Sequence, residues 1–71
     1  MAHTFNDLLD VIIDPRDEHQ RWPLGARLAW CCQKATEERH DIAPLIQCAL
    51  REGLSQDSAD KIPRRFRRAG R

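Results

Sequence analysis

The sequence has few of the residues that mark familiar kinds of functional site. Its 71 residues include three glycines, three cysteines, four aromatic side chains and no tyrosine. The glycines are Gly25, Gly53 and Gly70, which lie too far apart to form a glycine-rich loop around a phosphate. No apolar run approaches the roughly 20 residues that a membrane-spanning helix needs. The sequence therefore predicts neither a phosphate-binding loop nor a membrane segment.

The cysteines do not show the spacing of a disulfide framework. They are odd in number, and Cys31 and Cys32 are adjacent. The first apolar stretch is interrupted by Asp7 and Asp10, so it does not resemble the continuous apolar core of a secretion signal. These features lead us to expect a cytoplasmic protein.

A metal site and an active site are both poorly supported. Cys31, Cys32, Cys48 and His40 could supply four zinc ligands, but zinc motifs place paired ligands about two to four residues apart on a turn. Adjacent cysteines on a helix point about 100° apart, and free cysteine usually packs as a small apolar side chain. A chain this short also leaves little room for a substrate pocket of about 300 Å³. We therefore expect no enzymatic activity, no metal and no cofactor.

Helical periodicity is the main structural signal. The first helix is predicted from about Thr4 to Ile13, with Thr4 as N-cap and Asp7 completing a relative of the capping box. Asp14 precedes Pro15, which disfavours helical geometry and ends the helix. Five apolar residues fall on one broad arc of this helix: Phe5, Leu8, Leu9, Ile12 and Ile13.

A second helix is predicted from Pro23 to about Arg39, after a polar connection at residues 15–21. For the third helix, Asp41 is the expected N-cap, Pro44 lies in the first turn, and Gly53 is the left-handed residue at its end. Two neighbouring ridges of the second helix are expected to form one wide buried face: Leu24, Leu28, Cys31 and Ala35, with Gly25, Ala29, Cys32 and Thr36 beside them.

The fourth segment starts at Ser55 and keeps helical spacing to the end of the chain. Pro63 interrupts it, and because proline in a helix interior costs about 3 kcal/mol we expect a break or kink near Ile62. No alternating strand pattern is present. The sequence thus predicts an all-α fold, a small compact bundle of three to four short helices, with a helical domain at residues 1–62 and a basic segment at residues 63–71.

Charge is divided along the chain, although the net charge is only +1. Residues 1–60 carry six basic and eleven acidic side chains, whereas the last eleven residues carry six basic side chains and no acid. The basic residues are Lys61, Arg64, Arg65, Arg67, Arg68 and Arg71. Such a cluster can bind phosphates of a nucleic acid, pair with acids of this chain or of a partner protein, or form a solvated end.

Trp30 is the second candidate contact residue. On the predicted helix it projects about 100° outside the apolar stripe, among Arg27 and Lys34. An aromatic side chain on a charged face is either covered by another part of the fold or anchors an interface, and tryptophan and arginine are the residues most enriched at binding hot spots.

The function that these observations favour is a small, non-enzymatic regulator or inhibitor that binds another protein through a helical surface. Trp30, Arg27 and Lys34 are its predicted contact residues, together with the basic cluster. A domain of this size buries only about 60% of its unfolded surface, so a homodimer is an expected means of stabilisation. The alternative is a nucleic-acid-binding regulator that uses the C-terminal arginines.

Overall fold

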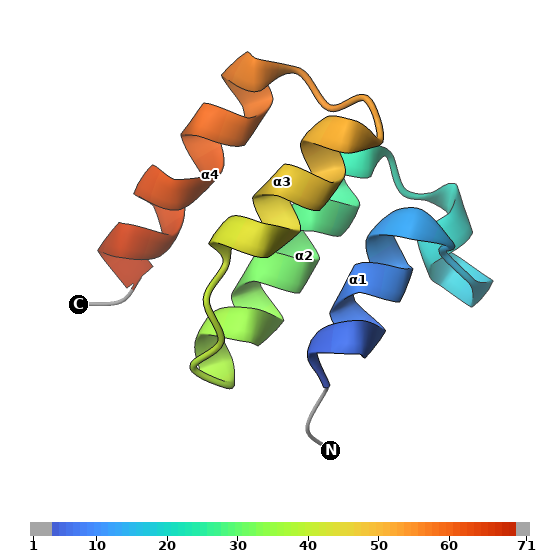
Figure 1. Cartoon of the computed structure of the whole chain (residues 1–71), viewed down its shortest axis with the longest axis horizontal. Coiled ribbons are helices and arrows are strands. Elements are labelled where there is room, and N and C mark those ends of the chain that lie inside the picture. Colours follow the sequence, from blue (N-terminus) through green and yellow to red (C-terminus); the bar gives the residue numbers. More distant parts are fainter. Residues whose placement is uncertain (1–3, 70–71) are drawn as a thin grey trace.

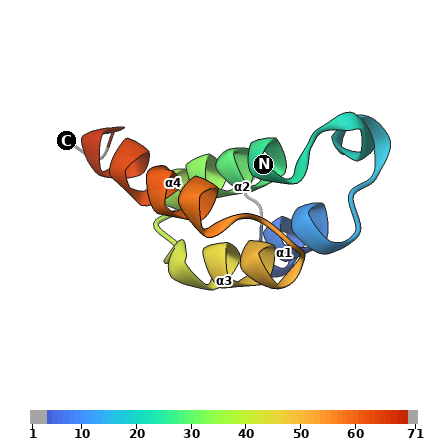
Figure 2. The ribbon, with the colours of Figure 1, turned by 90° about the horizontal axis from the view of Figure 1, so that it is seen from above.

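The computed structural model describes residues 4–69, with only the helical backbone described from residue 63 onward. It contains four α-helices and one short 3₁₀ helix, and no strand within the described residues, so the predicted all-α bundle is confirmed. Helices α1 and α3 form one layer and α2 and α4 the other (Figures 1 and 2). The molecule measures 32 × 31 × 18 Å, and its thin dimension spans these two layers.

Helix α1 spans Phe5–Ile13 and begins as the sequence predicts. The backbone N–H of Asp7 donates to Thr4 Oγ1 over 3.1 Å, and the N–H of Thr4 donates to Asp7 Oδ2 over 3.1 Å. This reciprocal capping box satisfies donors that the first helical turn leaves free. The helix stops at Asp14, before Pro15, because the proline disfavours helical geometry in the preceding residue.

The connection after α1 is more ordered than the sequence suggested. A 3₁₀ helix, η1, spans Asp17–Arg21 in the segment expected to be a plain polar connection. Asp17 adopts a positive φ of 54°, a conformation that aspartate tolerates better than most residues. The turn returns the chain to the start of α2, and the His19 ring contacts Trp30 of that helix.

Helix α2 spans Leu24–Glu37 and packs against each of the other three α-helices. Its end forms a Schellman motif, in which the N–H of His40 donates to the Ala35 carbonyl over 2.7 Å and the N–H of Arg39 to the Thr36 carbonyl over 3.1 Å. Arg39 holds the left-handed position with a φ of 62°. The predicted end at about Arg39 is therefore two residues too long.

Helix α3 spans Ala43–Arg51, and its N-cap is Ile42 rather than the predicted Asp41. The Asp41 carboxylate instead accepts a hydrogen bond from the N–H of Ala43 over 3.1 Å. This bond forms a local turn that begins one residue before the N-cap. The C-terminus agrees with the prediction, since Gly53 has a φ of 111° and the N–H of Leu54 donates to the Ala49 carbonyl over 3.0 Å.

Helix α4 spans Gln56–Ala69. Ser55 caps it as predicted, with its Oγ accepting the N–H of Ser58 over 3.2 Å. The helix does not break at Pro63, and a kink at that residue stays a prediction. The predicted boundary between residues 62 and 63 consequently falls inside a helix.

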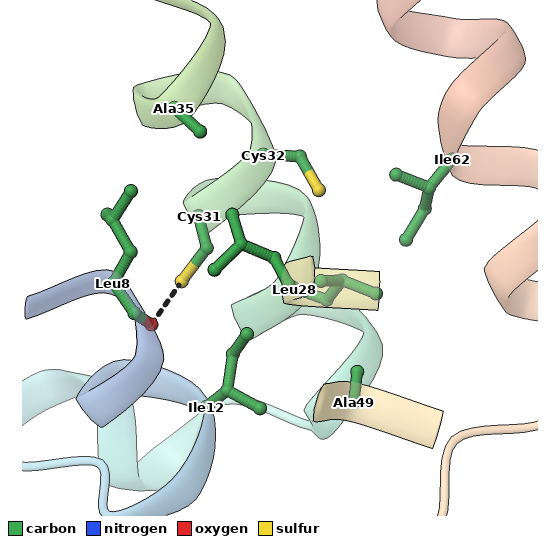
Figure 3. Packing of buried hydrophobic residues seen from close by; sticks show 9 residues of the cluster. Leu8, Ile12, Leu28, Cys31, Cys32, Ala35, Ala49 and Ile62 are labelled. Carbon is green, nitrogen blue, oxygen red and sulfur yellow. Dashed lines mark hydrogen bonds between the residues drawn. The ribbon is translucent and has the colours of Figure 1, made fainter. Parts of the chain in front are cut away.

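The core lies between the two layers and is built from small and medium-sized side chains (Figure 3). Each α-helix contributes to it, and Cys31 Sγ donates to the carbonyl of Leu8 over 3.2 Å. The buried apolar residues are Leu8, Ile12, Leu28, Cys31, Cys32, Ala35, Leu45, Ala49, Ala59 and Ile62. Among the described residues, no helix is long and apolar enough to cross a membrane.

Candidate functional site

An apolar groove lies between α1 and α3, which run side by side in the same direction (Figure 1). Its volume is about 480 Å³. Phe5, Leu9 and Ile13, spaced four residues apart, form the wall on α1, since this spacing aligns side chains along one side of a helix. The wall on α3 is formed by Pro44, Gln47, Cys48 and Arg51, with Glu52 directly after the helix.

The α1 wall is apolar but incompletely covered. Leu8 and Ile12 of the same helix are buried in the core, whereas Phe5 and Leu9 are half-buried and Ile13 retains 53% of its exposure. The predicted apolar arc of α1 therefore divides into a core-facing ridge and a groove-facing ridge. Protein surfaces with a concave apolar lining are typical sites for a ligand or a partner helix.

The charges near the groove differ between its two helices. Helix α1 carries Asp7 and Asp10 and no basic residue, and exposed Asp14 follows directly. Within its bounds, α3 has one charged side chain, Arg51 at its last position. The charged residues that line the groove itself are Arg51 and Glu52, at the C-terminal end of α3, whereas Asp10 and Asp14 line a separate hollow on the side of α1 that faces η1.

Cys48 lines the groove, but its thiol is not activated. Burial raises the pKa of Cys48, the neighbouring Glu52 raises it further, and Arg51 partly opposes them. Because the thiolate is the nucleophile, a raised pKa argues against a reactive cysteine. The groove is mostly apolar, and Cys48 is not an activated nucleophile within it.

The other two cysteines belong to the core. Burial raises the pKa of both Cys31 and Cys32 to about 12, so both remain neutral thiols. All three cysteines are unpaired. Within the described part of the chain, no three His, Cys, Asp or Glu side chains are grouped so that they could hold a metal ion.

Trp30 and Lys34, two of the predicted contact residues, belong to an aromatic cluster at the junction of η1 and α2. The His19 ring contacts two indoles, with its centroid 4.8 Å from that of Trp22 and 4.7 Å from that of Trp30. Lys34 Nζ lies 5.7 Å from the Trp30 ring centroid and 3.9 Å from a Glu37 carboxylate oxygen. Trp30 is half-buried, so the fold covers part of this side chain.

Arg27, the third predicted contact residue on α2, is engaged within the chain. Its guanidinium donates to the carbonyl of Ile12 over 2.7 Å and to that of Val11 over 3.3 Å. These carbonyls lie in the last turn of α1, where a positive charge is favourable to the helix dipole. Arg27 thus caps α1 and ties it to α2.

The predicted basic cluster is only partly described. Lys61 is exposed on α4, and the backbone of this helix continues through Arg64, Arg65, Arg67 and Arg68. The side chains of these arginines, and Arg71 as a whole, lie outside the described residues. In both views α4 and η1 are at opposite sides of the molecule (Figures 1 and 2).

Two features of these surfaces were missed by sequence reasoning. The groove was missed because all five apolar residues of α1 share one arc, and the sequence does not say that α2 covers only part of it. His19 belongs to the segment predicted as a polar connection, residues 15–21, yet its ring contacts two tryptophans. The width of the α1 arc was the one available signal, since it exceeds what a single neighbouring helix covers.

Comparisons with protein-family models, with curated proteins and with solved structures find no match for this chain.

Proposed function

We propose that this chain is a small, non-enzymatic regulatory or inhibitory protein that binds another protein in the groove between α1 and α3. The observation that carries the proposal is the exposed apolar ridge of α1, where Ile13 keeps 53% of its surface accessible beside half-buried Phe5 and Leu9. A soluble domain with so small a core gains by burying such a ridge, and a partner helix can fill an apolar groove of this kind.

The rest of the molecule supports a binding role over a catalytic one. The three thiols have raised pKa values, so none is a poised nucleophile at neutral pH. Three unpaired cysteines also suit a reducing compartment, and we propose that the protein acts in the cytoplasm. Self-association as a homodimer remains part of the proposal, as does contact through Trp30 and Lys34.

The test is a pull-down from lysate with tagged protein, treated with nuclease, followed by identification of the retained proteins. The Ile13→Asp variant places a charge in the groove. The control variant, Gln33→Asp, adds the same charge to the exposed surface of α2, away from the groove. We expect a specific partner that binds wild type and Gln33→Asp but not Ile13→Asp. A partner lost only on Trp30→Ala would place the binding surface at the aromatic cluster. If no protein is retained at all, the proposal is contradicted.

Nucleic-acid binding is the second candidate function. It is favoured by the continuous backbone of α4, which carries Lys61 and four arginines on one helix. If these side chains contact phosphates, affinity should fall steeply with salt, with a slope of about −0.9 per contact on duplex DNA. The measurement is duplex binding at several salt concentrations, with and without residues 64–71. A salt-independent signal, or one that survives the truncation, would exclude this function.

A further inference from the structure

We infer that α4 is a lid that opens independently of the other three α-helices and uncovers the thiol of Cys32. This motion goes beyond the proposed function, because it does not depend on what binds the α1/α3 groove. Two observations support it. The adjacent thiols of Cys31 and Cys32 are covered by different helices, and those two helices are held to α2 by different kinds of contact.

Cys31 and Cys32 point into two different helix interfaces of the core (Figure 3). Successive residues of a helix point about 100° apart, so neighbouring side chains of α2 face different partners. Cys31 Sγ points toward α1 and donates to the carbonyl of Leu8 over 3.2 Å, whereas Cys32 Sγ points toward Ile62 of α4. Both thiols are fully buried. Movement of α1 would therefore expose Cys31, and movement of α4 would expose Cys32.

Helix α1 is tied to α2 by hydrogen bonds as well as by its core side chains. Arg27 donates to the carbonyl of Ile12 over 2.7 Å and to that of Val11 over 3.3 Å. Cys31 adds the bond to Leu8. The side chains of Leu8 and Ile12 are 0% and 1% exposed. Separation of α1 from α2 would therefore expose two large apolar side chains and break three hydrogen bonds.

The described side chains of α4 hold it to the core by apolar contact alone. Among residues 56–62 the buried side chains are Ala59 and Ile62, of which only Ile62 is large, and it keeps 7% of its exposure. The side-chain hydrogen bonds of the same residues stay within α4 and its Ser55 cap. Local opening favours elements with few buried apolar contacts, so α4 should separate from α2 more readily than α1 does.

The chain that precedes α4 stays attached when this helix opens. Leu54 packs against the core, and its N–H donates to the carbonyl of Ala49 in α3 over 3.0 Å. Ser55 caps the first turn of α4, so the cap moves with the helix. A hinge between Leu54 and Ser55 therefore lets α4 move while α1, α2 and α3 remain packed.

The two adjacent thiols form a matched pair for the test. Burial is the largest cause that raises the pKa of each to about 12, so neither thiol reacts readily until its covering helix moves. The full chain is treated with iodoacetamide at about pH 8, and tandem mass spectrometry measures the initial alkylation rate of each cysteine. We expect partly exposed Cys48 to react first, and Cys32 to react at least about tenfold faster than Cys31.

The urea dependence of these rates separates local opening from unfolding of the whole chain. Below the unfolding transition, the Cys32 rate should change little with urea because a local opening exposes little surface. The Cys31 rate should rise more steeply, since its exposure requires a larger part of the fold to open. Equal rates for the two thiols with the same urea dependence would overturn the inference, as would faster alkylation of Cys31.

Two matched variants test whether α4 is the helix that moves. Ile62→Ala shortens the buried side chain of α4 that faces Cys32, and Ile12→Ala makes the same change on α1. We expect Ile62→Ala to raise the ratio of the Cys32 rate to the Cys31 rate by about tenfold or more, and Ile12→Ala to lower this ratio. If either variant unfolds, Ile62→Val and Ile12→Val make the same comparison with smaller cavities. A ratio that both variants leave unchanged, or change in the same direction, would overturn the assignment of the lid to α4.

Discussion

Helices α1 and α2 are both amphipathic, but the fold uses their apolar faces differently. Helix α2 contacts all three other α-helices, and four of its residues are buried. Helix α1 has five apolar residues on one arc, yet only Leu8 and Ile12 are buried. The difference lies in the neighbours, because α2 packs against α4 of its own layer and against α1 and α3 of the other layer, while α1 packs mainly against α2 and α3 (Figure 2). An apolar arc becomes core where other helices cover it and stays partly exposed where they do not.

The strongest test of this comparison is Leu28→Ala in the middle of α2. Leu28 is fully buried, so its truncation should leave a cavity and lower the free energy of unfolding by about 2–5 kcal/mol. Urea unfolding followed by circular dichroism measures the change. A loss below about 1 kcal/mol would contradict the central role of α2, since that cost is typical of much less buried sites.

The next largest effect is expected at alkaline pH, where the free energy of unfolding should fall because the buried thiols of α2 resist ionisation. The folded-state pKa of Cys31 and Cys32 is about 12, above the value of 9.0 expected in the unfolded chain. The folded chain therefore holds these protons where the unfolded chain releases them, and their stabilisation is complete below pH 9 and lost as the pH rises toward 12. The slope approaches about 1.4 kcal/mol per pH unit for each thiol. Urea unfolding between pH 8 and 10.5 measures it, and the double variant Cys31→Ala/Cys32→Ala should flatten the profile.

The link between the two helices can be broken at Arg27. Replacing Arg27→Met keeps much of the aliphatic chain and removes the hydrogen bonds to the carbonyls of Val11 and Ile12. Hydrogen bonds of charged groups contribute about 1.5–3 kcal/mol, so unfolding should become easier by that order. Hydrogen exchange should show increased opening of α1 and little change in α3. Arg27→Lys keeps the positive charge but lacks the forked guanidinium that reaches two carbonyls, so it should retain part of the stability.

The ends of α2 and α3 extend the comparison to two versions of one motif. Both helices finish with a left-handed residue, Arg39 after α2 and Gly53 after α3. Gly53→Ala should destabilise the fold by about 1 kcal/mol because the new Cβ disfavours the left-handed conformation. Arg39→Gly should stabilise it by a few tenths to about 1 kcal/mol for the same reason. Thermal unfolding measures both, and a stabilising Gly53→Ala would show that the turn relaxes.

The smallest effect on stability is expected at Ile13. Because this side chain is 53% exposed, Ile13→Ala should change the free energy of unfolding by no more than about 0.5 kcal/mol. The same variant should still weaken the binding of any partner that occupies the groove, which would separate the proposed docking role of the α1 ridge from its part in folding. Paired urea unfolding and pull-down measurements check this, and a large loss of stability would place Ile13 in the core instead.

Local signals in the sequence predicted most of the helices and several of their ends. The Thr4–Asp7 capping box, the stop before Pro15 and the turn at Gly53 each depend on residues within one helical turn, so they could be predicted without tertiary contacts. Asp41 was placed as an N-cap because its type favours that role, but the chain enters α3 one residue later. The left-handed Arg39 was missed because arginine carries no preference for that conformation.

The candidate site was less predictable, because several of its contacts join residues that are distant in the sequence. Trp30 and Lys34 were identified as neighbours because they share one face of α2, and the structure brings them together. His19 joins them from η1, and this contact depends on how residues 15–21 fold back onto α2. Arg27 was predicted at the surface, but its guanidinium reaches the C-terminus of α1, a partner fifteen residues away in the sequence.

By itself, the sequence determined the all-α class, a bundle of three to four helices, their apolar faces and the uneven distribution of charge. These properties follow from the spacing and type of residues within single helices. The tertiary structure alone decided which part of each apolar face is covered, which polar groups meet, and that α1 and α3 lie side by side with a groove between them. Helical spacing fixes the direction of a side chain on its own helix, but burial depends on a neighbour that is distant in sequence.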